Sequence, residues 1–231
     1  MVLKQMLFDE WEPTYNDIMY DFGFNKYDDE VSVRTLKAVT LNANLILDDD
    51  LHNIIMPEVT VFGDSSNLED DVSKLTPVGT FIAAGSATKR MLEMGFKPDI
   101  IVTDLDGDIQ SQAKANNNGA IALLHAHGDN ADLIRQYAHL FKGQIILTTQ
   151  SEPDRTVYNY GGFTDGDRAV CLARSFGARK IRLVGFDFEN PNPKKGSDPE
   201  MKKKKLKWAK KIIFDMNDPS VEIITPSNLA P

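Results

Sequence analysis

The stretch TFIAAGSATKRMLEMGFKPDIIVTDLDGD, residues 80–108, contains two apolar runs separated by a segment of helical length. The runs, 80–84 and 100–103, are nearly continuous rather than alternating, which is typical of strands covered on both faces. Residues 86–94 are long enough for a helix, and Gly95 follows at a position where helices commonly end. This order of strand, helix and strand predicts one unit of a parallel sheet.

The same alternation extends along the chain from about residue 58. Further apolar runs stand at 59–62, 120–124, 144–147, 181–184 and 221–224. Further segments of helical length stand at 109–116, 130–141 and 165–176. The pattern predicts an α/β fold with a doubly wound, mostly parallel sheet and helices on both faces. Such sheets bind ligands at the carboxyl ends of their strands, so we expect a site in the loops that follow the strands.

Residues 1–55 differ from the rest of the chain. They contain two helix-like segments, 11–22 and 31–47, and no clear strand. We predict a helical N-terminal subdomain over 1–55 and an α/β catalytic domain over 56–231. No long linker rich in glycine, serine or proline separates the two parts, so we expect the helices to pack on the sheet.

The composition is that of an ordinary globular chain, with 231 residues, 42% hydrophobic and 26% charged. The net charge of −8 argues against a protein that binds nucleic acid. No apolar run approaches the roughly 20 residues of a membrane-spanning helix, and the first ten residues lack the features of a secretory signal. The single cysteine, Cys171, excludes an intramolecular disulfide and fits a reducing compartment. We therefore expect a cytoplasmic protein.

The strongest chemical signal follows the run at 100–103, where Asp104, Asp106 and Asp108 are spaced two residues apart. In extended or turning backbone, Asp104 and Asp106 project to the same side. Two carboxylates at the end of a strand suit Mg²⁺, which takes one or two carboxylates together with phosphate oxygens and water. The alternative is an acidic turn in which Asp108 caps the next helix.

The following strand ends in HAHGDNAD, residues 125–132. Asp129 and Asp132 stand three residues apart at a helix start, where acidic residues also act as caps. Next to the first acidic cluster, they indicate a shared metal site. His125 and His127 are candidate ligands or a proton shuttle, although histidines in such places more often only line a loop.

Two other loops contain residues suited to phosphate. The small, open loop AAGSATK contains Gly85 and Ser86 and leads to Lys89. In YGGFTDGDR, residues 160–168, paired glycines allow backbone to approach a ligand closely, and Arg168 has a planar fork that matches phosphate oxygens. Taken by itself, this loop is better explained as a glycine-rich loop with a surface arginine. Neither a P-loop nor a dinucleotide-binding glycine motif is present.

The segment 194–211 carries nine basic and two acidic residues. Its lysines lie mainly opposite an apolar stripe of Leu206, Ala209 and Ile213 in a predicted amphipathic helix. A solvated helix face is the favoured interpretation. A rim that attracts phosphate is the alternative.

In order and spacing, these motifs resemble those of the archaeal 6-hydroxymethyl-7,8-dihydropterin diphosphokinase family over about residues 58–190. That family is similar to thiamine diphosphokinases in its catalytic half. The small-residue loop, the PD-strand-GDxDS motif and the DxxTD-type motif of those enzymes correspond to 84–89, to 98–106, and to Asp129 with Asp132.

This chain departs from the thiamine enzymes in two places. Gly107 follows Asp106 where they have serine, and the third loop reads TDGDR where they have a GGR-x-D-H-like run. The differences favour a pterin over thiamine as the acceptor.

The resemblance implies transfer of a diphosphoryl group from ATP to the hydroxymethyl group of the pterin, with Mg²⁺ as cofactor and AMP as a product. The expected catalytic residues are Asp104, Asp106 and Asp129. The expected metal ligands are Asp104, Asp106, Asp129 and Asp132. The residues expected at the nucleotide phosphates are Gly85, Ser86, Lys89 and Arg168. The candidate contacts of the acceptor ring are Asn130, Thr149, Gln150, Thr164 and Asp165.

Two alternatives remain open at this point. One is thiamine diphosphokinase activity, and the other is a non-catalytic module that senses nucleotides on the same fold. The expected partners are ATP and a small heterocyclic alcohol, with no nucleic acid and no membrane, and a homodimer is left open.

Overall fold

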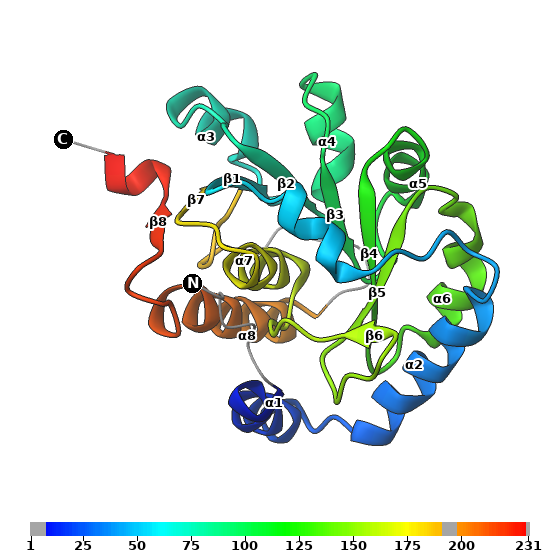
Figure 1. Cartoon of the computed structure of the whole chain (residues 1–231). Coiled ribbons are helices and arrows are strands. Elements are labelled where there is room, and N and C mark those ends of the chain that lie inside the picture. Colours follow the sequence, from blue (N-terminus) through cyan, green and yellow to red (C-terminus); the bar gives the residue numbers. More distant parts are fainter. Residues whose placement is uncertain (1–7, 191–197, 230–231) are drawn as a thin grey trace.

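The computed structural model describes residues 8–190 and 198–229, and within them the strands form a single parallel sheet (Figure 1). The strands are β1 (Glu58–Phe62), β2 (Thr80–Ala84), β3 (Ile100–Thr103), β4 (Ile121–Ala126), β5 (Ile145–Thr149), β6 (Val157–Tyr158), β7 (Lys180–Val184) and β8 (Glu222–Ile224). Their order across the sheet is β6-β5-β4-β3-β2-β1-β7-β8. The predicted α/β class with a parallel sheet is confirmed.

Helices cover both faces of this sheet. The α-helices are α1 (Phe8–Phe22), α2 (Lys26–Val39), α3 (Leu68–Lys74), α4 (Ala87–Glu93), α5 (Ile109–Asn117), α6 (Ala131–Tyr137), α7 (Asp165–Ser175) and α8 (Pro199–Lys210). Shorter helical segments are η1 (Asp48–Asn53), η2 (Ala138–Leu140), the π-helical η3 (Lys211–Asp215) and η4 (Pro226–Leu229). Helices α2 to α6 share one hydrophobic core with the sheet, and α7, η1 and η3 share the other.

Strand β4 shows why the apolar runs are continuous. Ala122 and Leu124 belong to the core under α2–α6, whereas Ile121 and Leu123 belong to the core under α7. Both faces of the strand are therefore shielded from water, and every position favours an apolar side chain.

The path of the chain creates a switch point between β1 and β7. From β1 to β5 the connections α3, α4, α5 and α6 lie on one face, and the chain then returns through α7 on the other face to place β7 beside β1. Val61 pairs in parallel with Leu183 there. In open α/β sheets the crevice for a ligand lies outside the carboxyl ends of the strands at such a point.

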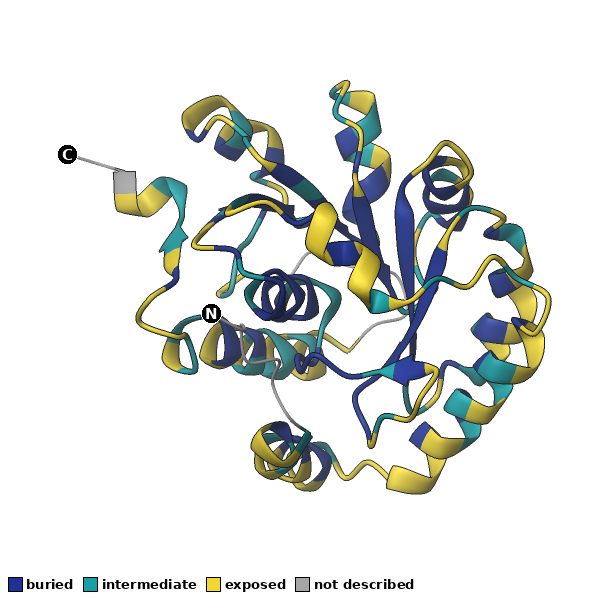
Figure 2. Cartoon of the chain, in the orientation of Figure 1, coloured by how far each residue is buried: buried dark blue, intermediate teal, exposed yellow. Residues whose placement is uncertain are grey.

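Helix α7 is buried along nearly all of its length, as Figure 2 shows. Its inner side packs on the sheet through residues such as Leu172. Its outer side carries Cys171, which shares a third core with Trp11 of α1 and Ile212 of η3. Polar residues in the first turn of α7 are therefore placed in the interior beside the strand ends.

The N-terminal residues differ in part from the expectation. The predicted helix over 31–47 is too long, because α2 ends at Val39. The Thr40 hydroxyl donates to the Leu36 carbonyl at 2.7 Å, and the asparagine-containing LNAN that follows favours turns. Leu45 then forms an isolated parallel bridge with Ile145.

The two N-terminal helices pack on different sides of the sheet. Helix α2 lies against α6, β4 and β5, whereas α1 packs by Trp11 on the side of α7. The division into parts 1–55 and 56–231 stays a prediction. Across the two described ranges, 8–190 and 198–229, each helix is too short or too polar to cross a bilayer.

Candidate active site

A cleft of about 860 Å³ opens at the carboxyl ends of the strands. Its walls are the loops after β1, β2, β3, β4, β5 and β7, the first turn of α7, the turn between α1 and α2, and one side of α8. The loops in which sequence reasoning placed the chemistry thus share one space.

The acidic loop after β3 is held in a specific shape. Leu105 has a φ of 67°, a left-handed conformation that costs a leucine on the order of 1–3 kcal/mol. Its side chain is buried in the core under α2–α6, and its N–H donates to the Thr103 hydroxyl at 2.9 Å. Gln112 of α5 donates to the Asp106 carbonyl at 2.7 Å. Anchored in this way, the loop places both Asp104 and Asp106 in the cleft wall.

Asp104 is a partly buried carboxylate of this loop, with 25% of its side chain exposed. Its Oδ2 lies 3.2 Å from Nε2 of His127, and its buried Oδ1 has no hydrogen-bond partner among the described residues. Burial raises the pKa of Asp104, but the hydrogen bond and charge of His127 outweigh it. The charges of Arg168 and Lys205 act in the same direction, so the pKa lies well below its usual range. Asp104 therefore carries a negative charge in the cleft wall, and its shielded Oδ1 is not used by another described residue.

A third carboxylate, Asp165, enters from the first turn of α7. Burial raises its pKa well above the usual range, and the charges of Asp104 and Asp106 add to this effect against the opposing charge of Arg168. On the other side, Ser86 Oγ lies 3.5 Å from Asp106 Oδ1. The charges of Asp104 and Asp106 thus disfavour the ionised form of Asp165, and a cation bound at this point of the cleft would relieve that repulsion.

The donor set fits Mg²⁺ better than a metal held by protein alone. Among residues 8–190 and 198–229, no three histidine, cysteine, aspartate or glutamate side chains gather closely enough to enclose a metal. Mg²⁺ is commonly bound by one or two carboxylates, with water and substrate phosphates completing its shell. Asp104 and Asp106, with the unused Oδ1 of Asp104, match that requirement.

The second predicted acidic pair is divided by the structure. Asp129 lies exposed at the edge of the cleft, with Oδ1 3.9 Å from Nδ1 of His127. Asp132 lies on the exposed side of α6, pairs with Arg135 at 2.7 Å and does not line the cleft. His127 stands between Asp104 and Asp129 and therefore links the two acidic loops.

Lys89 and Asp108 also lie apart from the cleft lining. Their side chains approach each other to 3.7 Å. Asp108 accepts the Ser111 N–H at 2.9 Å and is the N-cap of α5, which is the role that the alternative interpretation gave it.

Arg168 is buried in the first half of α7 instead of lying on the surface. Its guanidinium donates to Asp165 at 3.1 Å and to the side-chain oxygen of Gln150 at 3.4 Å. The preceding loop is held by Asp167, which accepts the N–H groups of Phe163 at 2.6 Å and of Thr164 at 2.8 Å. This capping box fixes the start of α7.

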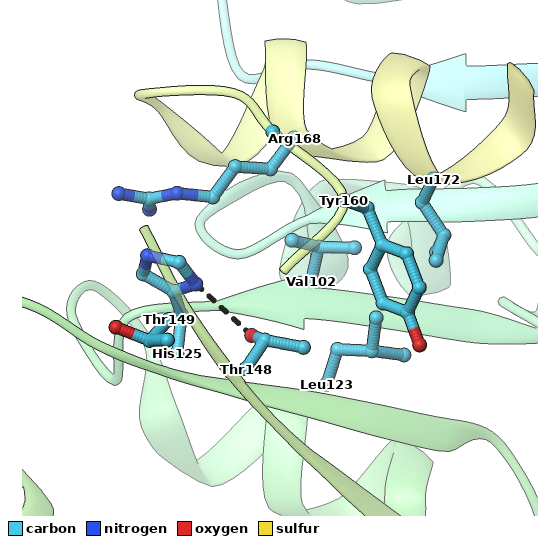
Figure 3. A pocket seen from close by; sticks show the side chains of 9 residues that line it. Val102, Leu123, His125, Thr148, Thr149, Tyr160, Arg168 and Leu172 are labelled. Atoms are coloured by element: carbon cyan, nitrogen blue, oxygen red, sulfur yellow. Dashed lines mark hydrogen bonds between the residues drawn. The ribbon is translucent and has the colours of Figure 1, made fainter. Parts of the chain in front are cut away.

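His125 lies beneath Arg168 rather than in the cleft. The two side chains line a small cavity together with Thr148 and Thr149 (Figure 3). The His125 Nδ1 is 2.9 Å from the Thr148 hydroxyl. Burial, together with the charges of Arg168 and His127, holds the pKa of His125 well below its usual range. His125 is therefore a neutral interior residue near pH 7.

The predicted ring contacts also separate into two groups. Gln150, Thr164 and Asp165 line the cleft, whereas Asn130 and Thr149 do not.

The Asn130 amide is used within the protein. It accepts the His127 N–H at 3.1 Å and donates to the carbonyls of Asp104 at 3.0 Å and of His125 at 2.7 Å. Asn130 thus ties the loops after β3 and β4 together.

Several aromatic residues that line the cleft were not predicted from the sequence. Phe24, in the turn between α1 and α2, has its ring centroid 6.5 Å from that of Phe163. Phe186 and Phe188 line the part of the cleft after β7. These aromatic residues come from three distant segments, and no local motif marks them.

The basic helix turns one part of its surface toward the cleft. Lys202 and Lys205 line the cleft, and Lys205 Nζ lies 5.6 Å from the centre of the Phe163 ring. Lys204 instead pairs with Asp21 at 2.8 Å. The alternative of a basic rim therefore gains support for two of the lysines.

Comparison with known proteins identifies similar chains. Residues 37–193 match a family model described as "6-hydroxymethylpterin diphosphokinase MptE-like". A Pyrococcus furiosus protein named 6-hydroxymethyl-7,8-dihydropterin pyrophosphokinase is 41% identical over 90% of this chain and 93% of its own length. Proteins of the same name from Methanocaldococcus jannaschii and Methanothermobacter thermautotrophicus are 39% and 37% identical, over 90% and 88% of this chain and 95% and 92% of their own.

Among solved structures, the MAf glycosyltransferase from Magnetospirillum magneticum is similar to this chain. It superposes with a TM-score of 0.54 at 14% identity, over 90% of this chain and 39% of that one. At this identity the similarity concerns the fold alone.

Proposed function

The chain belongs to the 6-hydroxymethylpterin diphosphokinase MptE-like family, and on that premise we propose that it diphosphorylates 6-hydroxymethyl-7,8-dihydropterin with ATP. The hydroxymethyl oxygen of the pterin attacks the β-phosphorus of ATP. The bond between this phosphorus and the oxygen that bridges it to the α-phosphorus breaks, and AMP leaves. Such transfers depend on positioning and electrostatic stabilisation rather than on a covalent nucleophile.

One observation supports this function above the others. The cleft brings an acidic pair, Asp104 and Asp106, together with the cations Arg168 and Lys205 at the ends of the central strands. A triphosphate with its cation needs both kinds of charge in one place. The paired carboxylates would hold Mg²⁺, which when bound neutralises charge that develops on the phosphates.

The remaining residues divide between the two substrates. Arg168 and Lys205 contact phosphate oxygens, and Ser86 lines the cleft after β2, whereas its neighbour Gly85 does not. Asp129 at the edge of the cleft accepts the proton of the attacking hydroxyl. Lys89 and Asp132 do not line the cleft and are left out of this proposal.

The acceptor ring has partners of two kinds. Thr164 and Asp165 offer hydrogen-bonding groups, and Phe24 and Phe163 offer aromatic surface for a flat ring. The Gln150 amide, predicted to contact the ring, is instead paired with Asp29 and Arg168. Recognition of a polar ring edge by buried groups discriminates strongly, because a wrong ring leaves those groups unpaired. Activity in the cytoplasm, and assembly as a homodimer, stay predictions.

Incubation with ATP, Mg²⁺ and either the reduced pterin or thiamine, followed by mass analysis, tests the proposal. We expect AMP and the pterin diphosphate, with a far higher kcat/KM for the pterin. An equal kcat/KM with thiamine would overturn the choice of acceptor, and only the reaction class, diphosphoryl transfer from ATP, would stand. ATP binding without AMP release would instead favour a nucleotide sensor.

A further inference from the structure

We propose that Asp29, a carboxylate of helix α2, positions Arg168 for phosphate through the side-chain amide of Gln150. The N-terminal helices would then complete the active site instead of only covering the sheet. The inference rests on the proposed function in one respect, the contact of Arg168 with phosphate.

Asp29 is 0% exposed and receives hydrogen bonds from three directions. The Tyr15 hydroxyl of α1 donates to Oδ2 at 2.6 Å, and the Gly128 N–H of the loop after β4 donates to Oδ1. The Gln150 Nε2 lies 3.3 Å from Oδ1 and 3.2 Å from Oδ2. The carboxylate thus joins α1, α2 and two loops of the cleft.

These contacts determine which way the Gln150 amide faces. Both oxygens of Asp29 accept hydrogen bonds, one from the Tyr15 hydroxyl and one from the Gly128 N–H, so the NH₂ group of the amide turns toward Asp29. The amide oxygen is then left on the opposite side, where it accepts from Arg168 at 3.4 Å. With the amide reversed, an oxygen would face the buried carboxylate and an NH₂ group would face the guanidinium, and both contacts would be lost.

Further contacts hold Gln150 and Arg168 in place. The Trp11 indole of α1 donates to the Gln150 backbone carbonyl at 2.9 Å. Asp165 accepts from the other end of the Arg168 guanidinium at 3.1 Å. The Arg168 guanidinium is therefore hydrogen-bonded on one side to Asp165 of its own helix and on the other side to the Gln150 amide, whose orientation Asp29 of α2 determines.

Asp29 acts at one remove from the substrates. Gly128, Gln150 and Arg168 line the cleft, whereas Asp29 does not. It is therefore a positioning residue. Its removal should weaken the binding of the ATP phosphates, because these are the groups that Arg168 contacts.

An exchange of the two partners tests this assignment. Asp29→Asn replaces one of the two acceptor oxygens by an NH₂ group, so the Gln150 amide is no longer forced into one orientation. Gln150→Glu places two carboxylates face to face. In the double variant Asp29→Asn/Gln150→Glu, the asparagine NH₂ donates to the new carboxylate, whose second oxygen accepts from Arg168. The net charge of the double variant equals that of the native pair. Glu30→Gln is the matched control, because it makes the same chemical change at an exposed position of α2.

The readouts are the Kd for ATP by calorimetry and the KM values for ATP and pterin. We expect each single variant to weaken ATP binding by about tenfold or more, since small displacements of a positioned group are costly. The pterin KM should change less than the ATP KM. The double variant should return to within a few-fold of the native ATP Kd, and Glu30→Gln should match the native protein.

Native ATP affinity in Asp29→Asn, or no recovery in a folded double variant, would overturn the proposal. Should Asp29→Asn fail to fold, Gln150→Met removes the same link. It should raise the Kd for ATP, and a change confined to the pterin KM would count against the inference. Calorimetry measures ATP binding without turnover. If the native protein binds ATP but releases no AMP, the proposed function is wrong, whereas the role of Asp29 in ATP binding can still be tested.

Discussion

The carboxylate of Asp165 fills the space that a side chain at Gly85 would need, because a Cβ there would lie 2.5 Å from Asp165 Oδ2. The end of β2 and the first turn of α7 thus meet with no room between them. Asp165 is also held by Arg168 at 3.1 Å, so it cannot yield without disturbing the guanidinium.

Gly85→Ala should therefore impair activity more than stability. The added methyl group pushes on Asp165, and through it on Arg168, at the point where phosphate is expected. We expect kcat/KM to fall by about tenfold or more, with the circular dichroism spectrum unchanged. A fully active Gly85→Ala enzyme would show that the contact between β2 and α7 does not matter for turnover.

Asp104→Asn and Asp106→Asn each preserve volume and remove one charge from the acidic pair. We expect either change to lower kcat by roughly a hundredfold or more while the fold persists. Asp132→Asn is the matched control, because this exposed residue lies outside the cleft lining, and it should stay within about twofold of the native rate. Unfolding of the first two variants would identify these aspartates as structural.

Removal of divalent cations should abolish turnover. The carboxylates of Asp104 and Asp106 repel a triphosphate unless a cation offsets their charge. Chelation followed by dialysis should eliminate AMP release, and added Mg²⁺ should restore it. Full activity after exhaustive chelation would contradict the metal assignment.

Lys205→Gln should raise the KM for ATP and reduce its dependence on salt. Lys205 lines the cleft and its charge reaches Asp104, so its loss weakens the attraction of phosphate. Lys207→Gln removes the same charge from an exposed position of α8 and serves as the control. We expect kcat to stay within a few-fold in both variants. Equal effects of the two changes would mean that only the overall charge of the helix matters.

An ion pair remote from the cleft should make stability depend on acid pH. Lys37 of α2 contacts Asp154 in the loop after β5. Burial opposes ionisation of Asp154, but hydrogen bonds from Lys37 and Thr156 lower its pKa to about 2 from an ordinary 3.8. A lowered pKa in the folded state stabilises the protein above pH 4, and this stabilisation is lost as the pH falls toward 2.

Lys37→Met should accordingly lower the free energy of unfolding by at most about 1 kcal/mol at pH 7, since both side chains are half-exposed. The difference from the native protein should shrink between pH 4 and pH 2 in urea titrations. Arg34→Met, which removes a charge from the same helix, is the control. A difference that grows as the pH falls would mean that Lys37 does not stabilise the ionised form of Asp154.

The sheet was predictable because each strand carries its own signal. Buried runs such as 100–103 are apolar on both faces, and breakers such as Gly95 separate them from helices. Strand β6 was missed because two residues leave no pattern, and α2 was overextended because Thr40 ends it through a contact to its own preceding turn.

The acidic loop of the candidate site was predictable for the same reason, since Asp104 and Asp106 follow a recognisable strand. Asp29 was not, because it sits in the acidic string DDE of a helix and only the tertiary fold distinguishes it from its exposed neighbours. Whether Lys205 rather than Lys207 faces the cleft likewise depends on how α8 docks.

The pairing of β1 with β7 has a consequence for synthesis of the chain. Val61 meets Leu183 only after about half of the polypeptide has been made in between. Until then the nascent sheet presents β1 as an open, apolar edge, of the kind that other chains can join. Pairing between such distant strands is intrinsically slow, so this edge of β1 stays open while the intervening residues are made. Helix α8 emerges later still, and the basic wall of the cleft is therefore assembled last.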